Sequence, residues 1–416
     1  MSTPVRDIGE TSHRPRVAFL ARNMMVGGAE RTYLNLANHT RHVTPVLVLL
    51  ERRGDLLRQL SADLDVRSLA GNEANDSGTP ELLQRIPGAS IPQLLRECRR
   101  LTTLVDTLDI RVVSSFVMRT HLIALMVKQL FRPELRVVLN IHEHMSESLG
   151  YLYPTPRSRL AARWVATQLF PRADRIVVVA DELKRDLAAN FGASPRLIAV
   201  HRNPVDLEGI RALSREPVSP FFPDDDNRPM ICALGRVVYL KGIDILLNAM
   251  AALRPTLATR LIVVGDGPER ERLSGQARQL GLEDAVRFVG WQSNPWRYLA
   301  RANVLALCSR TEAFPNALVE AMALGIPTVA VECTAGIREC LDDGDAGLLV
   351  PPNDGPALSR ALHRVLTEPA LAASLSQRGT AHVAQFGLAS RVADYEAMLL
   401  EQLTPSSPRG KRTPVR

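Results

Sequence analysis

Two glutamates, Glu312 and Glu320, lie eight positions apart where an apolar segment gives way to a helical one. The apolar run Leu305–Leu307 predicts the end of a buried strand, and Pro315 fits the first turn of a helix, where its missing N–H costs nothing. Glu312 then lies in the loop at the carboxyl end of the strand, and Glu320 lies further along the helix. Ligands bind at that edge of an open α/β sheet, and a helix N-terminus offers free N–H groups to an anion.

Two cations bracket a second strand-to-helix loop, Gly235-Arg-Val-Val-Tyr-Leu-Lys241. Because Met230–Gly235 predicts a strand, Arg236 and Lys241 are expected at its carboxyl end. A phosphate leaving group gains negative charge as its bond breaks, so fixed cations at this edge would stabilise the transition state of such a reaction more than the ground state. Arginine offers a bidentate fork and lysine a point charge. The alternative is a pair of solvated surface cations.

With the sequence around them, these residues resemble glycosyltransferase family 4, whose members are retaining, nucleotide-sugar-dependent enzymes of the GT-B architecture. The resemblance covers residues 15 to 403 and rests on motifs in the family's order: Gly27-Gly28-Ala29-Glu30, Gly235-Arg236 with Lys241-Gly242, Val264-Gly265-Asp266-Gly267-Pro268, Glu312 with Glu320, and Gly347-Leu348-Leu349-Val350-Pro351. It implies an α/β fold with two Rossmann-like domains, whose parallel sheets face a central cleft. It also implies a C-terminal helix that crosses back to the first domain.

The resemblance also implies roles for the residues around the two glutamates. Glu320 would hold the ribose hydroxyls of the donor, and Glu312 would lie near the transferred sugar. The helix N-terminus would present three backbone N–H groups to the diphosphate, those of Asn316, Ala317 and Leu318. Ala313 stands where the family commonly has glycine, which would narrow the room for the sugar.

Two further positions gain a role from the resemblance. His142 ends the apolar run Val137–Ile141 and would contact the donor sugar near its reacting carbon, although a capping histidine is the alternative. Gly27 and Gly28 fall in the first strand-to-helix loop, near the donor diphosphate or the acceptor. Glycine there lets the backbone approach a phosphate closely, but a tight turn explains the pair equally well.

Strand-like and helix-like segments alternate along the chain, which predicts parallel sheets covered on both faces. A chain of 416 residues exceeds the usual size of one hydrophobic core. The clearest change of composition lies within 214–229, where four prolines accompany Asp224, Asp225 and Asp226, which we expect to be solvated. We expect a disordered N-terminus, an acceptor domain, a linker, a donor domain, a crossover helix and a disordered basic tail, at residues 1–14, 15–205, 206–229, 230–388, 389–403 and 404–416.

The expected elements follow from the apolar patterns. Strands are predicted at 16–21, 46–50, 112–116, 136–141, 175–180 and 197–201, and in the second domain at 230–235, 261–264, 286–288, 304–307, 328–331 and 348–350. Helices are predicted at 29–38, 91–108, 156–170, 182–190 and 389–403. Residues 71–90 are expected to form a loop with short helical pieces.

The net charge of +7 is unevenly distributed. Residues 1–205 hold 28 Lys and Arg against 20 Asp and Glu, whereas residues 206–416 hold 23 against 24. A basic first half suggests an anionic partner, such as a membrane surface or a phosphate-bearing acceptor, although an arginine-rich composition explains it equally well. The expected membrane contacts are two groups of arginines on separate helices: Arg157, Arg159 and Arg163, and Arg96, Arg99 and Arg100.

Several classes of protein are excluded. Five cysteines form no C-x-x-C pair, which favours buried free thiols in a reducing cytosol. The nine histidines contain no H-x-x-x-H pair, so we expect no metal and no cofactor besides the nucleotide sugar. No G-x-G-x-x-G follows the first strand, which argues against a dinucleotide oxidoreductase. The sequence shows no signal peptide or membrane-spanning run, so we expect a cytoplasmic protein that can also lie on the inner face of the membrane.

These patterns predict a retaining glycosyltransferase that moves a hexose-type sugar from a nucleoside diphosphate donor, with UDP expected, to a glycan or lipid-linked acceptor. The segments Phe116–His121, Asn203–Asp206 and Ala335–Glu339 look like members that build bacterial cell-surface glycans on lipid carriers. We expect a front-face mechanism, with double displacement as the alternative chemistry, and no nucleic-acid partner. The alternative functions are a nucleotide-sugar epimerase or phosphorylase on the same architecture, and a non-catalytic nucleotide-sugar-binding homologue.

Overall fold

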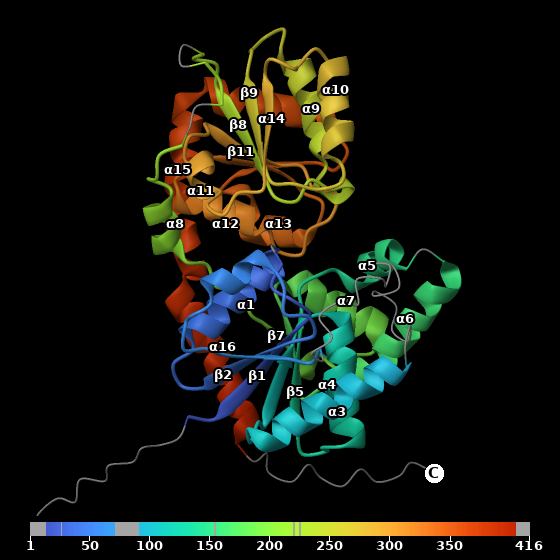
Figure 1. Ribbon diagram of the computed structural model, residues 1–416. Coiled ribbons are helices and arrows are strands. Elements are labelled where there is room, and N and C mark those ends of the chain that lie inside the picture. Colours follow the sequence, from blue (N-terminus) through green and yellow to red (C-terminus); the bar gives the residue numbers. More distant parts are fainter. Residues whose placement is uncertain are drawn as a thin grey trace, which may run out of the picture.

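A computed structural model of the chain describes residues 14–25, 27–70, 91–153, 155–218, 221–223 and 226–404. The expected loop at 71–90, nearly all of the expected N-terminal tail and residues 405–416 of the expected C-terminal tail lie outside the described residues. Figure 1 shows two α/β domains, one above the other, with the last helix running along the lower one. Each domain holds one parallel sheet, as the alternating pattern predicted.

The sheet of the first domain has seven parallel strands in the order β3-β2-β1-β4-β5-β6-β7. Its central strands are mostly apolar and are buried along nearly their whole length, because helices cover both faces of a parallel sheet. The edge strand β3 was not expected, since its sequence Asp-Val-Arg-Ser is short and polar, and it is held by pairing with β2 alone. The strands are β1 (Arg16–Ala21), β2 (Thr44–Leu49), β3 (Asp65–Ser68), β4 (Val112–Ser115), β5 (Arg136–Ile141), β6 (Arg175–Val178) and β7 (Ile198–Val200).

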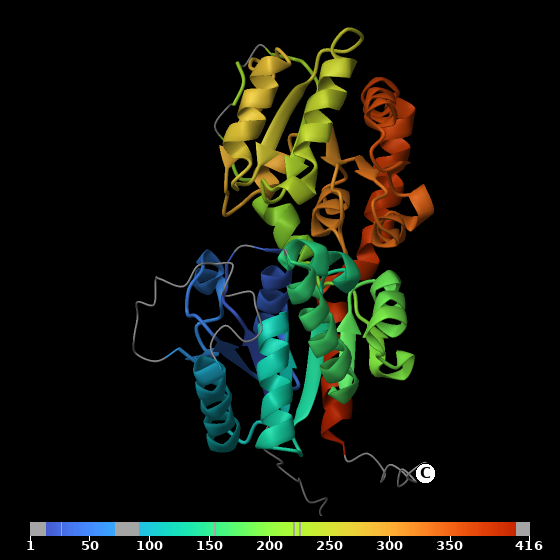
Figure 2. The ribbon, with the colours of Figure 1, turned by 90° about the vertical axis from the view of Figure 1, so that its right-hand side faces the viewer.

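Helices cover the faces of this sheet, and α3 and α4 run side by side in the turned view of Figure 2. The helices of the first domain are α1 (Gly28–His39), α3 (Ile91–Thr107), α4 (Met118–Leu130), α5 (Met145–Leu152), α6 (Pro156–Leu169) and α7 (Asp181–Phe191). Within the described part of the chain, no helix is long and apolar enough to cross a bilayer.

The second domain repeats the architecture with six parallel strands in the order β10-β9-β8-β11-β12-β13. The strands are β8 (Met230–Leu234), β9 (Arg260–Val264), β10 (Val286–Gly290), β11 (Val304–Leu307), β12 (Thr328–Val331) and β13 (Leu348–Val350). The helices are α9 (Ile243–Leu253), α10 (Arg270–Gln279), α11 (Trp296–Leu299), α12 (Asn316–Ala323), α13 (Ala335–Cys340), α14 (Gly355–Thr367) and α15 (Pro369–His382).

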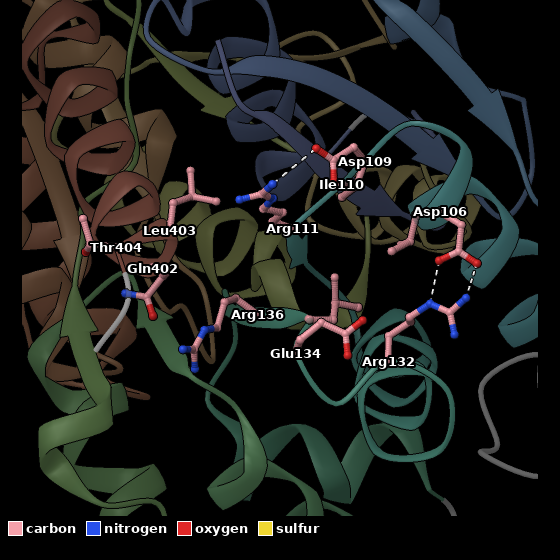
Figure 3. Close-up of a pocket in the computed structure, with 12 residues that line it drawn as sticks. Asp106, Asp109, Ile110, Arg111, Arg132, Glu134, Arg136, Gln402, Leu403 and Thr404 are labelled. Atoms are coloured by element: carbon pink, nitrogen blue, oxygen red, sulfur yellow. Dashed lines mark hydrogen bonds and ion pairs between the residues drawn. The ribbon is translucent and has the colours of Figure 1, made fainter. Parts of the chain in front are cut away.

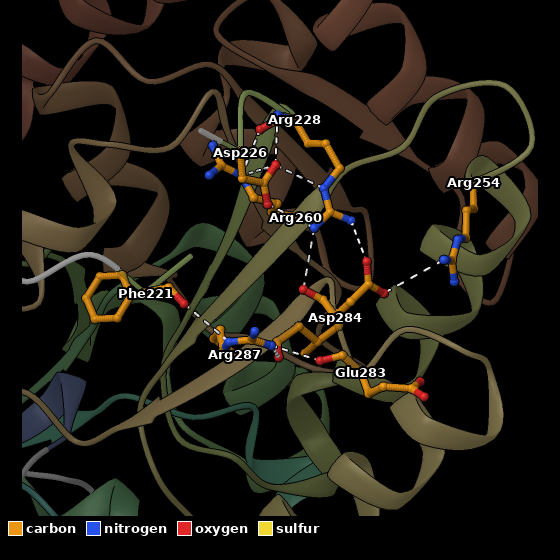
Figure 4. A network of polar contacts seen from close by, with 9 residues as sticks. Phe221, Asp226, Arg228, Arg254, Arg260, Glu283, Asp284 and Arg287 are labelled. Carbon is orange, nitrogen blue, oxygen red and sulfur yellow. Dashed lines mark hydrogen bonds and ion pairs between the residues drawn. The ribbon is translucent and has the colours of Figure 1, made fainter. Parts of the chain in front are cut away.

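The segment between the two sheets is folded against the second domain. It begins with the short helix α8 (Leu207–Leu213), where Arg211 Nε donates to the carbonyl of Ala323 at 3.0 Å. Further on, Asp226 is not a solvated carboxylate, because it pairs with Arg228 at 2.9 Å and with Arg260 at 3.8 Å (Figure 4). The hydrogen bond from Arg228 holds the pKa of Asp226 near 2.

The last helix, α16 (Leu388–Leu403), crosses back and completes the core of the first domain, as expected. Tyr395 buries its hydroxyl between Ser114 and Asn140, at 2.6 and 2.8 Å. The buried carboxylate of Glu396 accepts backbone N–H groups from the turn at 41–43, at 2.6, 2.7 and 3.2 Å. One carboxylate oxygen of Glu396 thus accepts three hydrogen bonds from residues more than 350 positions earlier in the chain.

We predict that Glu396→Ala lowers the free energy of unfolding of the first domain by about 2–4 kcal/mol, because three backbone N–H groups, that of Val43 buried, lose their acceptor. Urea unfolding of the full chain measures this effect. Glu401→Ala, an exposed position on the same helix, is the matched control and should change the value by less than about 0.5 kcal/mol. Equal effects of the two substitutions would contradict the anchoring role of Glu396.

Candidate active site

The loops at the carboxyl ends of the two sheets meet at the boundary between the domains. Asn316, the first residue of α12, contacts the first domain through both atoms of its amide. Its Nδ2 donates to the carbonyl of Gly28 at 3.5 Å, and its Oδ1 accepts from Asn203 Nδ2 at 2.9 Å. The structure therefore brings two of the predicted donor-binding residues, Gly28 and Asn316, together from opposite domains.

Two of the predicted catalytic residues form an ion pair. Lys241 Nζ contacts Glu312 Oε1, and Ser309 Oγ donates to the same oxygen at 2.8 Å. Gly242 makes this geometry possible, since its φ is +61° and an added Cβ would lie 1.9 Å from the carbonyl oxygen of Cys308. Close approach of the loop after β8 to the end of β11 fixes the pair. An anionic ligand placed at Lys241 would have to compete with Glu312 for the Lys241 ammonium.

Arg236 is exposed in the same loop, and its charge acts on a carboxylate of the first domain. Burial raises the pKa of Glu30, and the Arg236 charge opposes that rise. The Glu30 carboxylate folds back over Gly27, where an added Cβ would lie 2.2 Å from Oε2. A side chain at position 27 would displace only the flexible end of Glu30, so this contact does not by itself require glycine.

Glu320 is 7% exposed and is not a surface carboxylate. Burial raises its pKa, and the positive charge of Arg31 opposes the rise. The Arg31 guanidinium, from the first domain, lies 5.0 Å from the ring centroid of Trp296 in the second. Sequence reasoning missed Arg31 and Trp296; the only available signal was that Arg31 directly follows the Gly-Gly-Ala-Glu motif.

The N-terminus of α12 differs in one detail from the expectation. The N–H of Leu318 already donates to the carbonyl of Pro315 at 3.0 Å, because the first turn of this helix is tight. In the described part of the chain, the N–H groups of Asn316 and Ala317 have no such partner, so these two are available to an anion. Leu318 is therefore withdrawn as a backbone donor to the diphosphate.

His142 follows β5 directly, and its ring is stacked on Phe116 with centroids 5.6 Å apart. Burial lowers its pKa to about 4, so the imidazole is neutral near pH 7 and can donate or accept one hydrogen bond without carrying charge. His121 lies close by and bonds Ser115 Oγ at 2.8 Å. Among the described residues, His142 makes no hydrogen bond with the Lys241–Glu312 pair.

The two domains also cap each other's helices. Glu182 on α7 accepts from the backbone N–H groups of Ala335 and Gly336 at 2.6 and 3.3 Å. In return, Glu339 on α13 accepts from the N–H of Asp181 at 3.2 Å. Gly336 must be glycine, because a Cβ there would lie 2.2 Å from the carbonyl oxygen of Ala313. This packing fixes the loop that carries Glu312 against both domains.

A pocket of about 500 Å³ lies elsewhere, at the amino-terminal edge of the first sheet beside the end of α16 (Figure 3). Its charged side chains are largely paired, including Arg132 with Asp106 and Arg111 with Asp109. Ligands of parallel sheets bind at the opposite, carboxyl edge, so we do not assign the active site to this pocket. Within the described ranges, no group of three or more metal-ligating side chains is present.

Comparison with known proteins identifies the family. The family model for glycosyl transferases group 1 matches residues 215–382, and the model for glycosyltransferase family 4 matches residues 26–208. The chain belongs to glycosyltransferase family 4. The two matches cover the second and the first domain in turn, and they include all of the predicted site residues from Gly27 to Glu320.

Individual members of the family extend this comparison. A Campylobacter jejuni N-acetylgalactosamine-N,N'-diacetylbacillosaminyl-diphospho-undecaprenol 4-alpha-N-acetylgalactosaminyltransferase is 29% identical over 62% of this chain and 67% of its own length. The lipopolysaccharide core biosynthesis glycosyltransferase LpsE of Rhizobium meliloti is 31% identical over 53% of this chain and 57% of its own. Anabaena HepE, solved in complex with UDP and glucose, aligns with a TM-score of 0.74 and 19% identity over 93% of this chain and 100% of that chain. The GT-B architecture expected from the sequence is thereby confirmed.

We predict different losses on replacing the two glutamates. Glu320→Ala should chiefly weaken nucleotide affinity, because the ribose contact that the family resemblance implies would be made both before and during the reaction, whereas Glu312→Gln should chiefly lower kcat. Calorimetry with free UDP, together with steady-state kinetics, separates the two effects. Loss of UDP binding in Glu312→Gln with normal binding in Glu320→Ala would mean that the roles are reversed.

We also predict a measurable pH dependence from His121. Burial lowers the pKa of His121 from the ordinary 6.5 to about 3. At a pH between these two values, His121 is protonated in the unfolded chain and neutral in the folded protein. Stability is therefore full above pH 6.5 and falls as the pH is lowered. Between pH 6.5 and 5, urea unfolding should show His121→Gln losing about 2 kcal/mol less stability than the parent protein. The exposed His39→Gln is the control, and an unchanged slope in His121→Gln would contradict the assignment.

Proposed function

We propose that this protein transfers a hexose-type sugar from a nucleoside diphosphate sugar, with retention of the anomeric configuration, to a glycan or lipid-linked acceptor. The observation that carries the proposal is the Lys241–Glu312 ion pair at the boundary between the domains, beside the α12 N-terminus. A diphosphate placed there would meet the Lys241 ammonium and the N–H groups of Asn316 and Ala317. The exposed Arg236 guanidinium lies in the same loop as Lys241 and adds a second cation.

The chemistry follows from these charges. The bond between the anomeric carbon and the β-phosphate oxygen breaks, and Lys241 and Arg236 balance the negative charge that develops on the leaving diphosphate. The acceptor hydroxyl oxygen bonds to the same face of the anomeric carbon, and its proton passes to the leaving phosphate. The products are the new glycoside and a nucleoside diphosphate. We favour this front-face path, with double displacement as the alternative chemistry.

The donor, acceptor and location are parts of the same proposal. We propose UDP as the nucleotide, as in the HepE complex, and a lipid-linked acceptor, in line with the name of the Campylobacter enzyme. The five cysteines are free, which supports a reducing cytoplasmic location. We further propose that the reaction needs no divalent metal, because Arg236 and Lys241 supply positive charge at the diphosphate.

The test is nucleotide release from a panel of UDP and GDP sugars, measured in excess chelator. We expect turnover with at least one donor, and Lys241→Ala should lower kcat/KM by about two to four orders of magnitude without changing the fold. Arg278→Ala, at an exposed position on α10 of the same domain, is the control and should retain full activity. Normal turnover by correctly folded Lys241→Ala would reject the role of Lys241 at the diphosphate. Loss of activity in chelator, restored by magnesium or manganese, would reject the proposal that the reaction needs no divalent metal.

A further inference from the structure

Helix α6 exposes two large apolar side chains on one face. Leu160 is 70% exposed and Trp164 is 64% exposed, the two highest values for large hydrophobic residues in the described chain. Single exposed apolar side chains are common on soluble proteins and need no explanation. These two lie four positions apart and are therefore neighbours on the helix surface. Together they form an apolar face that is uncovered in the structure.

The charged side chains of α6 itself have one sign. The sequence of α6, Pro-Arg-Ser-Arg-Leu-Ala-Ala-Arg-Trp-Val-Ala-Thr-Gln-Leu, contains three arginines and no acidic residue. At 100° per residue, Arg157 lies on one side of Leu160 and Trp164, and Arg159 and Arg163 lie on the other. All three arginines are exposed. On the opposite face of the helix, the small side chains of Ala162 and Ala166 are buried.

The second arginine group differs from the first. Arg96, Arg99 and Arg100 on α3 are also exposed, and Arg100 donates to the carbonyl of Leu69 at 2.6 Å. Within the described part of α3, no large apolar side chain is exposed beside them. Sequence composition made the two helices equivalent candidates for contact with a membrane. The structure separates them, since α6 joins charge to an apolar centre and α3 offers charge alone.

We propose that α6 is the surface by which this protein lies on an anionic lipid bilayer, with Leu160 and Trp164 entering the boundary between headgroups and acyl chains. Arg157, Arg159 and Arg163 would then meet the lipid phosphates. An apolar centre with a basic rim is the pattern of helices that lie in the plane of a membrane, and tryptophan favours that boundary. Two apolar side chains are few for a protein interface, which needs about 800 Å² from each partner.

The position of α6 suits such a contact. It follows α5, which begins three residues after His142, and Figure 1 shows both helices at the edge of the first domain beside the domain boundary. Glu147 on α5 accepts a hydrogen bond from Thr311 of the second domain. A bilayer under α6 would bring a lipid-linked acceptor close to the active site. This last consequence rests on the proposed function, whereas the membrane contact itself does not.

Sedimentation with vesicles tests the proposal on the full chain. We expect binding to phosphatidylcholine vesicles that contain phosphatidylglycerol, weak binding to phosphatidylcholine alone, and loss of binding as salt rises. The double variant L160S/W164S should bind at least about tenfold more weakly. The triple variant R157Q/R159Q/R163Q should lose about 100-fold, at roughly fivefold for each arginine. The control R96Q/R99Q on α3 should stay within about twofold of the parent protein.

Fluorescence gives a second readout. Entry of Trp164 into the bilayer should shift its emission to shorter wavelength on addition of anionic vesicles, and Trp164→Phe should remove that shift. Equal binding by L160S/W164S and the parent, or an equal loss in the α3 control, would overturn the proposal. If the α6 variants alter the oligomeric state in sedimentation equilibrium but not vesicle binding, the face is instead an interface between copies.

The same variants separate this inference from the proposed function. All α6 variants should release nucleotide from the donor at the parent rate when the acceptor is a water-soluble fragment. Vesicle binding without any sugar transfer would reject the proposed function and leave the membrane surface standing. Normal sugar transfer with no vesicle binding would reject the membrane surface and leave the proposed function standing.

Discussion

Every strand in each sheet runs parallel to its neighbours, so all strand-to-helix loops of a domain emerge at one edge. Two such domains can present their ligand-binding loops to each other only if those edges face. The structure satisfies this constraint with Gly28 and Asn203 on one side and Asn316 on the other. The same constraint brings the charges of the site together. Lys241 lies in the loop after the carboxyl end of β8, and Glu312 lies in the loop after the carboxyl end of β11.

The site is already full of contacts between protein groups. Glu312 forms an ion pair with Lys241, and the Arg31 guanidinium lies over the Trp296 ring. Glu182 accepts hydrogen bonds from two backbone N–H groups of α13. Under the proposed function, the diphosphate of the donor would replace some of these contacts with its own. Because burial raises the pKa of Glu320 and Arg31 opposes that rise, any separation of the domains that removes Arg31 also changes the affinity of Glu320 for protons. Domain contact and site electrostatics are therefore coupled.

Sequence patterns predicted the two sheets and the crossover helix, because apolar periodicity and short motifs are local signals. They named Lys241 and Glu312 as site residues but did not predict the ion pair between them. They failed where structure depends on distant partners. The polar strand β3 is stabilised by its pairing with β2, and Asp226 is paired with arginines that include the distant Arg260. The contact between Arg31 and Trp296 joins residues from different domains, so it could not be predicted from spacing along the chain. The bonded N–H of Leu318 depends on the exact tightness of one helical turn.

The anchoring of α16 has a consequence for how the protein is made. Val392, Tyr395, Met398 and Leu399 belong to the core of the first domain, yet they are among the last described residues of the chain. On the ribosome, the first domain emerges early but lacks one wall of its core until the second domain has been synthesised. At 5–20 residues per second, that interval lasts roughly 10–40 s. During this time the apolar face that α16 will cover is exposed, which makes the nascent first domain a natural client for chaperones.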